Sequence, residues 1–245
     1  MKILVCITHV PDTTSKISFI DNNSAFDKTG VQYIIGPYDD YALARAVELK
    51  ESHEAEITVL NVGTAESEPS IRKALAIGAD KAIRIDAEPT DPVFVAKQIT
   101  AIAKKENYDL IMMGRESIDY NGGIVHGLVG EMLDIPSISP VMILDLDGTT
   151  AKMQKEIEGG KQIVEAALPL VLGCQEPIAE WKIPNMRGIM SARTKPLEVI
   201  PAEGSGASSE VKGYEMPAAR TACKLVEAGN EEELVRLLKD EAKAL

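Results

Sequence analysis

The chain has 245 residues, 38 of them acidic and 26 basic, and a formal net charge of -12. This charge argues against a nucleic-acid surface, which needs clustered Lys and Arg, and suits a basic partner or simple solubility better. Hydrophobic residues make up 45 % and aromatic residues 4 %, so we expect a core of aliphatic side chains. The length allows one large domain, or one domain with an appendage.

Targeting and redox signals favour a cytoplasmic protein. No run approaches the roughly 20 apolar residues that cross a bilayer, so we expect no membrane insertion. Residues 1–7 predict an opening strand rather than a signal peptide, and no Arg-rich transit peptide is present. The isolated cysteines Cys6, Cys174 and Cys223 suit a reducing compartment and exclude a CxxC motif. The three histidines share no ligand spacing, so no metal site is predicted.

Slightly more than the first half of the chain alternates between strand and helix patterns. The predicted elements are a strand at 3–7, a polar turn at 8–14, a hairpin with turns at 21–24 and 28–30, a helix from 36–40 onward, a strand at 57–62, a helix at 68–77, a strand at 81–85, a helix at 91–105, a strand at 109–113 and a helix at 124–133. This alternation predicts an α/β fold with a parallel sheet covered on both faces.

The pattern changes after Pro136. Segments 141–146, 151–157 and 162–172, separated by glycine turns, predict antiparallel strands that extend the sheet. From residue 175 onward prolines interrupt regular structure, residues 204–209 predict a flexible stretch, and a last helix follows Asn230 as its cap.

We therefore expect a nucleotide-binding α/β domain over residues 1–199 and a C-terminal arm with a helix over residues 200–245. Such an arm has little core of its own. It needs another surface to pack on, and a second chain would supply one.

Most of the chemistry is concentrated in residues 114–127, between the strand at 109–113 and the helix at 124–133. A glycine-bearing loop between a buried strand and a helix directs backbone N–H groups and a helix dipole at one point, which suits a phosphate. The spacing matches neither the dinucleotide fingerprint nor a Walker loop. Taken alone, the loop fits a tight crossover turn equally well.

Several separated motifs resemble the β subunit of an electron transfer flavoprotein. They are Pro11-Asp12, Gly36-Pro37-Tyr38, the segment 71–80, the segment 114–119, the segment 156–160, Leu168-Pro169-Leu170-Val171, Glu176-Pro177 and Ile183-Pro184-Asn185-Met186. The resemblance covers essentially the whole chain, and the ordered set is more specific than any one motif.

The resemblance implies a Rossmann-like sheet of the adenine nucleotide alpha hydrolase type and a heterodimer with an α subunit. In that family α holds most of the redox FAD and β binds a structural AMP. Electrons pass from acyl-CoA dehydrogenases or related flavin dehydrogenases to a membrane quinone reductase, the ETF-quinone oxidoreductase, as in fatty acid beta-oxidation. The chain would be an electron carrier subunit without catalytic residues of its own.

By position, the resemblance assigns two groups of residues. The cofactor-binding residues are Cys6, Gly36, Pro37, Tyr38, Asp39, Val62, Gly114, Arg115, Glu116, Ser117, Asp119, Asn121, Gly122, Gly123, Ile124 and Val125. They follow neighbouring strands, as expected for a ligand site in an α/β sheet. The partner-binding residues are Ile183, Pro184, Asn185 and Met186, in a docking loop over 176–189.

The docking loop has a second interpretation, in which Trp181 and Ile183 simply pack inward. If Ile183 is exposed, it is the kind of anchor that a partner pocket accepts. Lys182, Arg187 and Arg193 make this segment basic on an acidic chain, which favours an acidic partner surface.

Single side chains keep alternatives open. His126 either approaches a phosphate or is exposed on its helix. Asp119 is expected to hold the loop by accepting backbone N–H bonds, and Glu116 is a candidate for an adenine or ribose contact. Tyr38 lies either near the partner's flavin or against the core. Glu156 and Glu158 fit a solvated strand face better than an acid–base pair.

The cofactor and the function also have alternatives. Many family members carry a hydroxyl residue at the place of Val125 and a Gln-type residue at that of Ile124. Loss of the hydroxyl removes a phosphate donor, and some electron-bifurcating members that lack it bind a second FAD instead of AMP and oxidise NADH. A further alternative, from another class, is a stand-alone nucleotide-binding regulatory protein. It would form a homodimer and would not need the arm.

Overall fold

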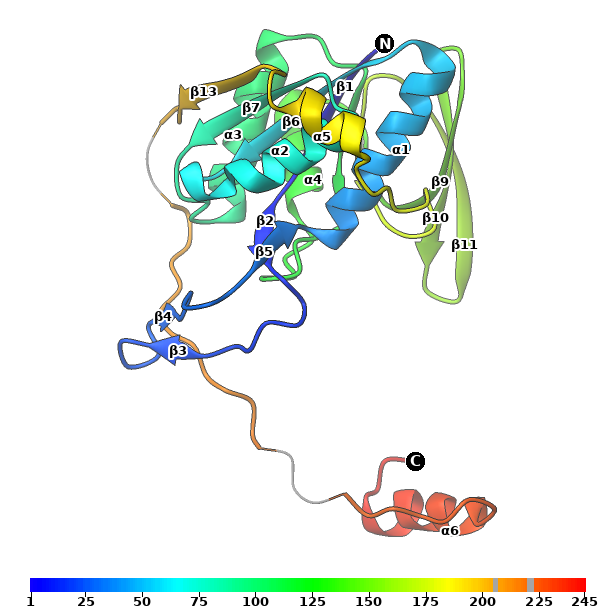
Figure 1. Cartoon of the computed structure of the whole chain (residues 1–245). Coiled ribbons are helices and arrows are strands. Elements are labelled where there is room, and N and C mark those ends of the chain that lie inside the picture. Colours follow the sequence, from blue (N-terminus) through cyan, green and yellow to red (C-terminus); the bar gives the residue numbers. More distant parts are fainter. Residues whose placement is uncertain (205–206, 220–222) are drawn as a thin grey trace.

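The computed structural model describes residues 1–204, 207–219 and 223–245. Within them, nine strands form one sheet in the order β11-β10-β9-β12-β8-β1-β6-β7-β13 (Figure 1). The strands are β1 (Lys2–Cys6), β6 (Glu56–Val62), β7 (Lys81–Asp86), β8 (Leu110–Gly114), β9 (Ser137–Asp147), β10 (Thr150–Ile157), β11 (Gly160–Ala167), β12 (Leu170–Cys174) and β13 (Leu197–Pro201). Neighbours from β9 to β13 run parallel, whereas β9, β10 and β11 pair antiparallel. The predicted α/β fold with an antiparallel extension is confirmed.

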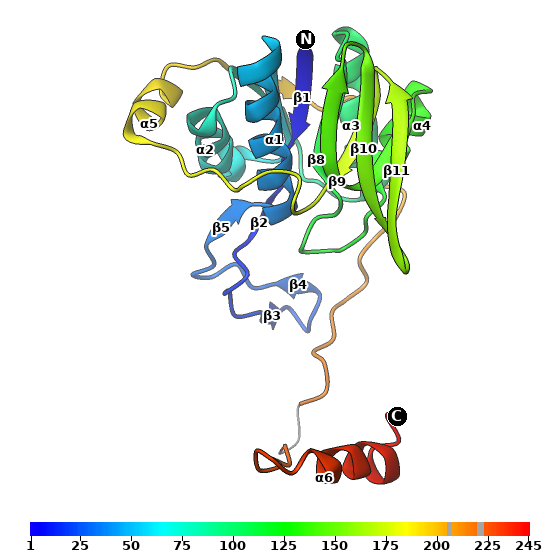
Figure 2. The same cartoon turned by 90° about the vertical axis from the view of Figure 1, so that its right-hand side faces the viewer.

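Helices cover both faces of this sheet. The first face carries α1 (Pro37–His53), α2 (Glu68–Ile77) and α5 (Met186–Ala192), and the second carries α3 (Pro92–Lys105) and α4 (Val125–Leu133). Figure 2 shows α1, α2 and α5 grouped together. A hydrophobic core lies on each face of the sheet, and alternate residues of β1 point into one or the other. Ile3 and Val5 pack in the core on the α1 face, whereas Leu4 and Cys6 pack in the second core, on the α3 face. The central strands are therefore buried on both faces, as expected for a parallel sheet between two layers of helices.

Local signals explain why the predicted helices begin and end where they do. Helix α2 has Pro69 in its first turn and Gly78 just past its end. Helix α3 starts after Asp91, whose carboxylate accepts from the N–H groups of Val93 (2.8 Å) and Phe94 (2.9 Å). These signals are local in sequence, so both helices could be predicted closely.

One predicted strand is wrong. The segment 162–172 was expected as a single antiparallel strand, but it divides into β11 and β12 around Pro169. Proline has no N–H to donate to a ladder, so antiparallel pairing ends there. Strand β12 then lies between β8 and β9 and runs parallel to both. It is fully buried, and it brings the chain that follows it, from Gln175, to the same sheet edge as β8.

Regular structure also appears where prolines predicted none, since α5 and β13 both lie beyond residue 175. The predicted helix after Asn230 is present as α6 (Glu231–Arg236), followed by a π-helical turn over Leu237–Glu241. The Asn230 side chain makes no cap hydrogen bond, so this detail of the prediction is wrong. The Gly229 N–H instead donates to the Glu231 carboxylate at 3.1 Å.

Two small sheets and the arm lie beside the carboxyl edge of the sheet. Strand β2 (His9–Pro11) pairs with β5 (Tyr33–Ile35), and β3 (Phe19–Ile20) forms the predicted hairpin with β4 (Ala25–Phe26). After β13 the chain runs along this hairpin, and α6 stands apart from the sheet (Figure 1). Residues 205 and 206 of the predicted flexible stretch lie outside the described residues.

Candidate functional site

The candidate site lies where β8, β1 and β6 end side by side. The chain runs from β1 through β6 to β7 on one side and places β8 on the other side of β1. Parallel α/β sheets bind ligands at such a reversal, at the carboxyl ends of the strands. The strands end at Cys6, Val62 and Gly114, all three among the predicted site residues.

A single buried carboxylate joins two of these strand ends. Asp39, in the first turn of α1, is 3 % exposed. Its Oδ2 accepts from the N–H (2.8 Å) and the hydroxyl (2.6 Å) of Thr8, and its Oδ1 accepts from the N–H of Gly114 (2.7 Å). Burial raises the pKa of Asp39 to about 6, although the hydrogen bonds from Thr8 and Gly114 act in the opposite direction. Thr8 was not among the predicted residues.

Two glycines make this approach possible. A Cβ on Gly114 would lie 2.6 Å from Cβ of Tyr38 and 2.8 Å from Oδ1 of Asp39. A Cβ on Gly36 would lie 2.6 Å from Oδ2 of Asp39 and would overlap the Thr8 hydroxyl. The predicted segments 36–39 and 114–125 therefore meet through contacts that only glycine permits.

The loop after β8 is held by its own polar side chains. Ser117 donates its hydroxyl proton to the Asp119 carboxylate, which also accepts from the N–H of Tyr120 at 2.9 Å. The predicted role of Asp119 in holding the loop is confirmed. The chain then passes through Asn121 (φ 50°) and Gly123 (φ 61°) in left-handed conformations before α4 begins.

Arg115 is the cation nearest the start of this loop, and its charge is already engaged. It donates to Gln175 Oε1 (2.8 Å) and to Glu116 Oε1 (3.0 Å), and its guanidinium lies 5.2 Å from the centre of the Tyr38 ring. Gln175 follows β12, so the misassigned strand supplies a residue that the sequence did not predict. Gln175 in turn donates to the Glu156 carboxylate at 2.6 Å.

The loop ends at the start of α4, which has no side-chain cap. Its N-cap residue is Ile124, which has no polar side chain, and within the described part of the chain no side-chain cap hydrogen bond is formed. The first N–H groups of a helix have no partner within the helix, so they are free to bind an anion. Next to them, His126 is partly buried, and its Nδ1 lies 3.4 Å from Ser137 Oγ of β9. Burial lowers the pKa of His126, which keeps the ring neutral at pH 7.

Cys6 and Val62 contribute an apolar floor on the α3 and α4 side. Both are buried in the second core, together with Met113 and, at its margin, Val125. Burial raises the pKa of the Cys6 thiol well above its usual range, so this thiol stays protonated.

The predicted docking segment forms a separate surface on the α1 face. Ile183 is 73 % exposed and Met186 72 % exposed. Trp181 is also half exposed, but its Nε1 donates to Asp40 Oδ2 at 3.1 Å. The interpretation in which Ile183 packs inward is therefore wrong. Asn185 caps α5 by accepting from the N–H of Gly188 at 2.8 Å.

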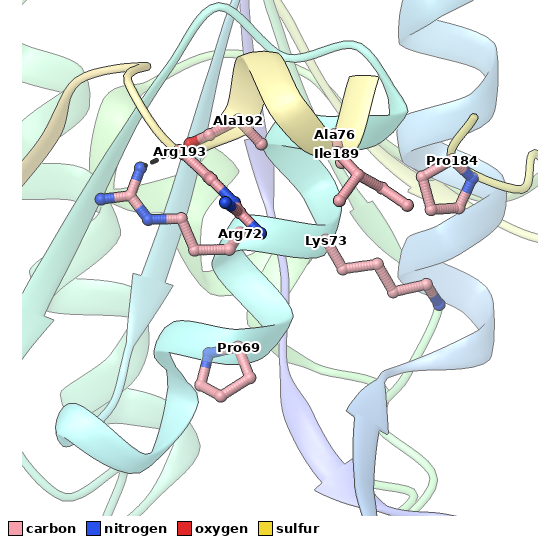
Figure 3. A pocket seen from close by; sticks show the side chains of 8 residues that line it. All are labelled: Pro69, Arg72, Lys73, Ala76, Pro184, Ile189, Ala192 and Arg193. Carbon is pink, nitrogen blue, oxygen red and sulfur yellow. Dashed lines mark hydrogen bonds between the residues drawn. The ribbon is translucent and has the colours of Figure 1, made fainter. Parts of the chain in front are cut away.

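A groove of about 510 Å³ lies beside this segment, between α2 and α5 (Figure 3). It is lined by Pro69, Arg72, Lys73, Ala76, Pro184, Ile189, Ala192 and Arg193. Arg72 donates to the carbonyl oxygens of Ala192 (2.8 Å) and Lys195 (2.9 Å), which fixes the end of α5 against α2.

Neither a metal-binding cluster nor a membrane-spanning helix is found in the part of the chain that the structure describes. Among residues 1–204, 207–219 and 223–245, no cluster of three or more His, Cys, Asp or Glu side chains is arranged to hold a metal ion. In the same described part of the chain, none of the helices has the length and apolar character to span a bilayer.

The fold and site define a doubly wound α/β protein with a phosphate-compatible loop at the chain reversal. The family description "Electron transfer flavoprotein domain" matches residues 24–205. The chain belongs to the electron transfer flavoprotein family.

Three relatives that cover most of the chain are β subunits. The electron transfer flavoprotein subunit beta of Bacillus subtilis (strain 168) is 33 % identical, and the alignment covers 100 % of both chains. The subunit beta of Syntrophomonas wolfei is 33 % identical, with 91 % of this chain and 88 % of the relative covered. The human subunit beta is 30 % identical over 98 % of this chain and 97 % of its own length. The resemblance predicted from the sequence is confirmed.

Proposed function

We propose that this chain is the β subunit of a heterodimeric electron transfer flavoprotein and binds AMP between the strand ends and α4. The observation that carries the nucleotide proposal is the uncapped start of α4 at the reversal of the sheet. Free N–H groups and the positive end of a helix dipole suit a phosphate there. The adenosine would extend toward the ends of β1 and β6.

The residues of the crevice fit such a ligand. A Cβ on Gly122 would meet no atom within 4 Å, so the loop leaves open space at this point. Cys6 and Val62 offer an apolar surface beneath. Arg115 is engaged by Glu116 and Gln175, so backbone N–H groups rather than a free cation would hold the phosphate. The absence of a hydroxyl at Val125 leaves FAD as the competing ligand.

In the proposed heterodimer the redox chemistry is supplied by FAD, held mainly by the α subunit. This chain would complete the carrier, bind its nucleotide and recognise its partners, without a general acid, base or nucleophile of its own. We place the protein in the cytoplasm, between acyl-CoA dehydrogenases or related flavin dehydrogenases and a membrane quinone reductase. Residues 200–245 would pack on the α subunit, because the arm exposes most of its apolar side chains, among them Leu225 and Val235.

Dehydrogenases would dock on Ile183, Pro184, Asn185 and Met186. Large aliphatic side chains that project from a capped, proline-framed segment form a small exposed apolar patch. Burial of such anchors in a partner pocket supplies much of the binding energy of an interface.

The nucleotide proposal is tested by co-expressing the chain with its α subunit, denaturing the purified heterodimer and quantifying the released AMP and flavin. Equal amounts of AMP and FAD support the proposal. Two FAD per heterodimer and no AMP would identify a bifurcating flavoprotein that oxidises NADH. A stable homodimer that binds no α subunit would identify the regulatory alternative instead.

The docking proposal is tested with Ile183→Glu. We expect slower reduction of the heterodimer by an acyl-CoA dehydrogenase at unchanged flavin content, because a charge at the anchor cannot enter an apolar pocket. Ile163→Glu is the matched control, since Ile163 is as exposed as Ile183 but lies on the edge strand β11. Equal slowing by both variants, or loss of flavin with Ile183→Glu, would exclude a specific docking role.

A further inference from the structure

Asp40 is a buried acid that lies next to Asp39 but faces a different part of the molecule. It is 7 % exposed, and its Oδ2 accepts from Lys73 Nζ (3.1 Å) and Trp181 Nε1 (3.1 Å). Lys73 belongs to α2, whereas Trp181 precedes the docking residues by two positions. One carboxylate therefore links α1, α2 and the docking segment.

Trp181 is held by these polar contacts more than by packing. Its side chain remains 55 % exposed, so burial alone does not fix the ring. The Lys73 ammonium lies 5.7 Å from the centre of the indole, within the range of a cation–π contact. Asp40 and Lys73 thus hold the ring by its N–H group and by its face.

The other end of the docking segment is fixed as well. Besides the bonds from Arg72, Lys195 donates to the carbonyl oxygens of Leu75 (2.8 Å) and Ala79 (2.6 Å) at the end of α2. Gly188 of α5 lies so close to Ala76 that an added Cβ would overlap the Ala76 carbonyl oxygen. Figure 3 shows α5 lying across α2 at this point. Trp181 and α5 are therefore two anchors, and Ile183 lies between them.

Ile183 and Met186 are 73 % and 72 % exposed, so packing alone does not fix the direction of their side chains. Their orientation must come from the two anchors. A segment that is already ordered loses less conformational entropy on binding, so its partner binds more tightly for the same contacts.

We propose that Asp40 is a positioning residue for partner docking, which orients Ile183 and Met186 through Lys73 and Trp181 without touching the partner. This inference rests on the proposed docking function. It also gives a reason for a costly arrangement, because Asp40 Oδ1 is buried without a hydrogen-bond partner among the described residues. A buried, half-satisfied carboxylate destabilises a fold, so a merely structural role would be served better by an apolar residue.

The test uses the intact heterodimer and measures its reduction by an acyl-CoA dehydrogenase, with KM and kcat resolved. Asp40→Ala and Trp181→Phe should each raise the KM for the heterodimer roughly tenfold, with kcat unchanged, since only the docking equilibrium is altered. The double variant should be no worse than either single one, because both remove the same link. Lys73→Met should raise KM in the same direction. Glu51→Ala, at an exposed acid on α1, should leave KM unchanged.

A spectroscopic signal reports the link directly, since Trp181 is the only tryptophan of the chain. The emission of Trp181, obtained by subtracting the Trp181→Phe heterodimer, should shift to longer wavelength in Asp40→Ala. Reduction of the bound flavin by dithionite should not change. If Asp40→Ala fails to fold, the KM values of Trp181→Phe and Lys73→Met still test the positioning role.

Unchanged KM in Trp181→Phe and Lys73→Met would overturn the inference, and so would additive effects in the double variant. Ile183→Glu distinguishes the docking function of the segment from the positioning role of Asp40. If Ile183→Glu slows reduction while the Asp40, Lys73 and Trp181 variants do not, docking on this segment stands and the positioning role fails. If Ile183→Glu has no effect, the docking function itself fails.

Discussion

The backbone N–H of Gly114 donates a 2.7 Å hydrogen bond to Oδ1 of Asp39, across 75 residues of sequence. The other oxygen of the same carboxylate binds Thr8, so the ends of β8 and β1 are tied to the first turn of α1. The candidate nucleotide loop begins directly after Gly114. Its starting point is therefore fixed by a buried charge rather than by the loop itself.

Replacing this carboxylate should be strongly destabilising. Asp39→Ala leaves two N–H groups and one hydroxyl without an acceptor, so we expect a loss of about 2–4 kcal/mol in the free energy of unfolding. Urea denaturation of the purified protein measures this loss. Glu51→Ala, at an exposed position on the same helix, should change the stability by less than about 0.5 kcal/mol. A similar effect of both variants would show that the Asp39 hydrogen bonds contribute little.

The contribution of Asp39 should also depend on pH. Its pKa is raised from 3.8 to about 6 in the folded protein. Between these values the folded state binds more protons than the unfolded state, so stability falls as pH rises. The part of the Asp39 contribution that is linked to protonation is fully present below about pH 4 and is lost by the time pH has passed about 6.

The stability difference between wild type and Asp39→Ala should therefore shrink by about 1–3 kcal/mol between pH 4 and pH 7. Urea denaturation at several pH values measures this difference in the free energy of unfolding. Groups that titrate alike in both proteins contribute equally to the two free energies, so their contributions cancel in the difference. A difference that is constant with pH, or that grows, would show that the folded-state pKa of Asp39 is not raised.

Alanine should destabilise the protein at Gly114, the last residue of β8, but not at Gly122 in the loop that follows. Gly114→Ala places a Cβ 2.6 Å from Cβ of Tyr38 and 2.8 Å from Oδ1 of Asp39, so it should separate β8 from α1. We expect loss of bound nucleotide and about 1–3 kcal/mol of stability.

Gly122→Ala is the matched control, since its Cβ would meet nothing within 4 Å. It should leave the fold intact. Nucleotide released on denaturation and the urea midpoint are measured for both variants. A harmless Gly114→Ala would contradict the close approach of Tyr38 and Asp39 to β8.

A structural feature could be predicted from the sequence when the residues that determine it lie close together in the chain. Helices α2 and α3 carry their start and stop residues within a few positions, so their bounds could be predicted closely. Strand β12 could not be placed in the sheet, because its parallel partners β8 and β9 are chosen by tertiary packing and not by local pattern.

In the candidate site, too, features set by local sequence could be predicted and features set by tertiary contacts could not. The loop 114–125 could be found from its glycines and its position between a strand and a helix. The bonds of Asp39 to Thr8 and of Asp40 to Trp181 could not, because 31 and 141 residues separate the partners. The one available hint was two consecutive acids at the start of α1, and the helix dipole alone would explain those.

The C-terminal arm should depend on Tyr214 for its attachment to the body. The Tyr214 N–H donates to the Asn23 carbonyl oxygen at 2.8 Å, and its ring stacks on Phe19 with a centroid distance of 4.7 Å. Its hydroxyl lies 3.4 Å from that of Tyr120, in the candidate nucleotide loop. The arm is also attached nearer the sheet, where the Ser208 N–H donates to Asp91 Oδ2 at 2.6 Å. Beyond Ser208 most of the described arm residues are exposed, so the Tyr214 contacts contribute much of the free energy that holds this part of the arm.

Tyr214→Ala removes the stacking and the hydroxyl contact, worth about 1–2 kcal/mol together. Cleavage of the arm by a dilute protease should then become roughly tenfold faster, because the cleaved state is the detached one. The urea midpoint of the sheet domain should not change, because Tyr214 lies outside both cores. Tyr214→Phe keeps the stacking and should be cleaved nearly as slowly as wild type. Fast cleavage of Tyr214→Phe would assign the attachment to the Tyr120 hydroxyl contact instead, and unchanged cleavage of Tyr214→Ala would show that other contacts hold the arm.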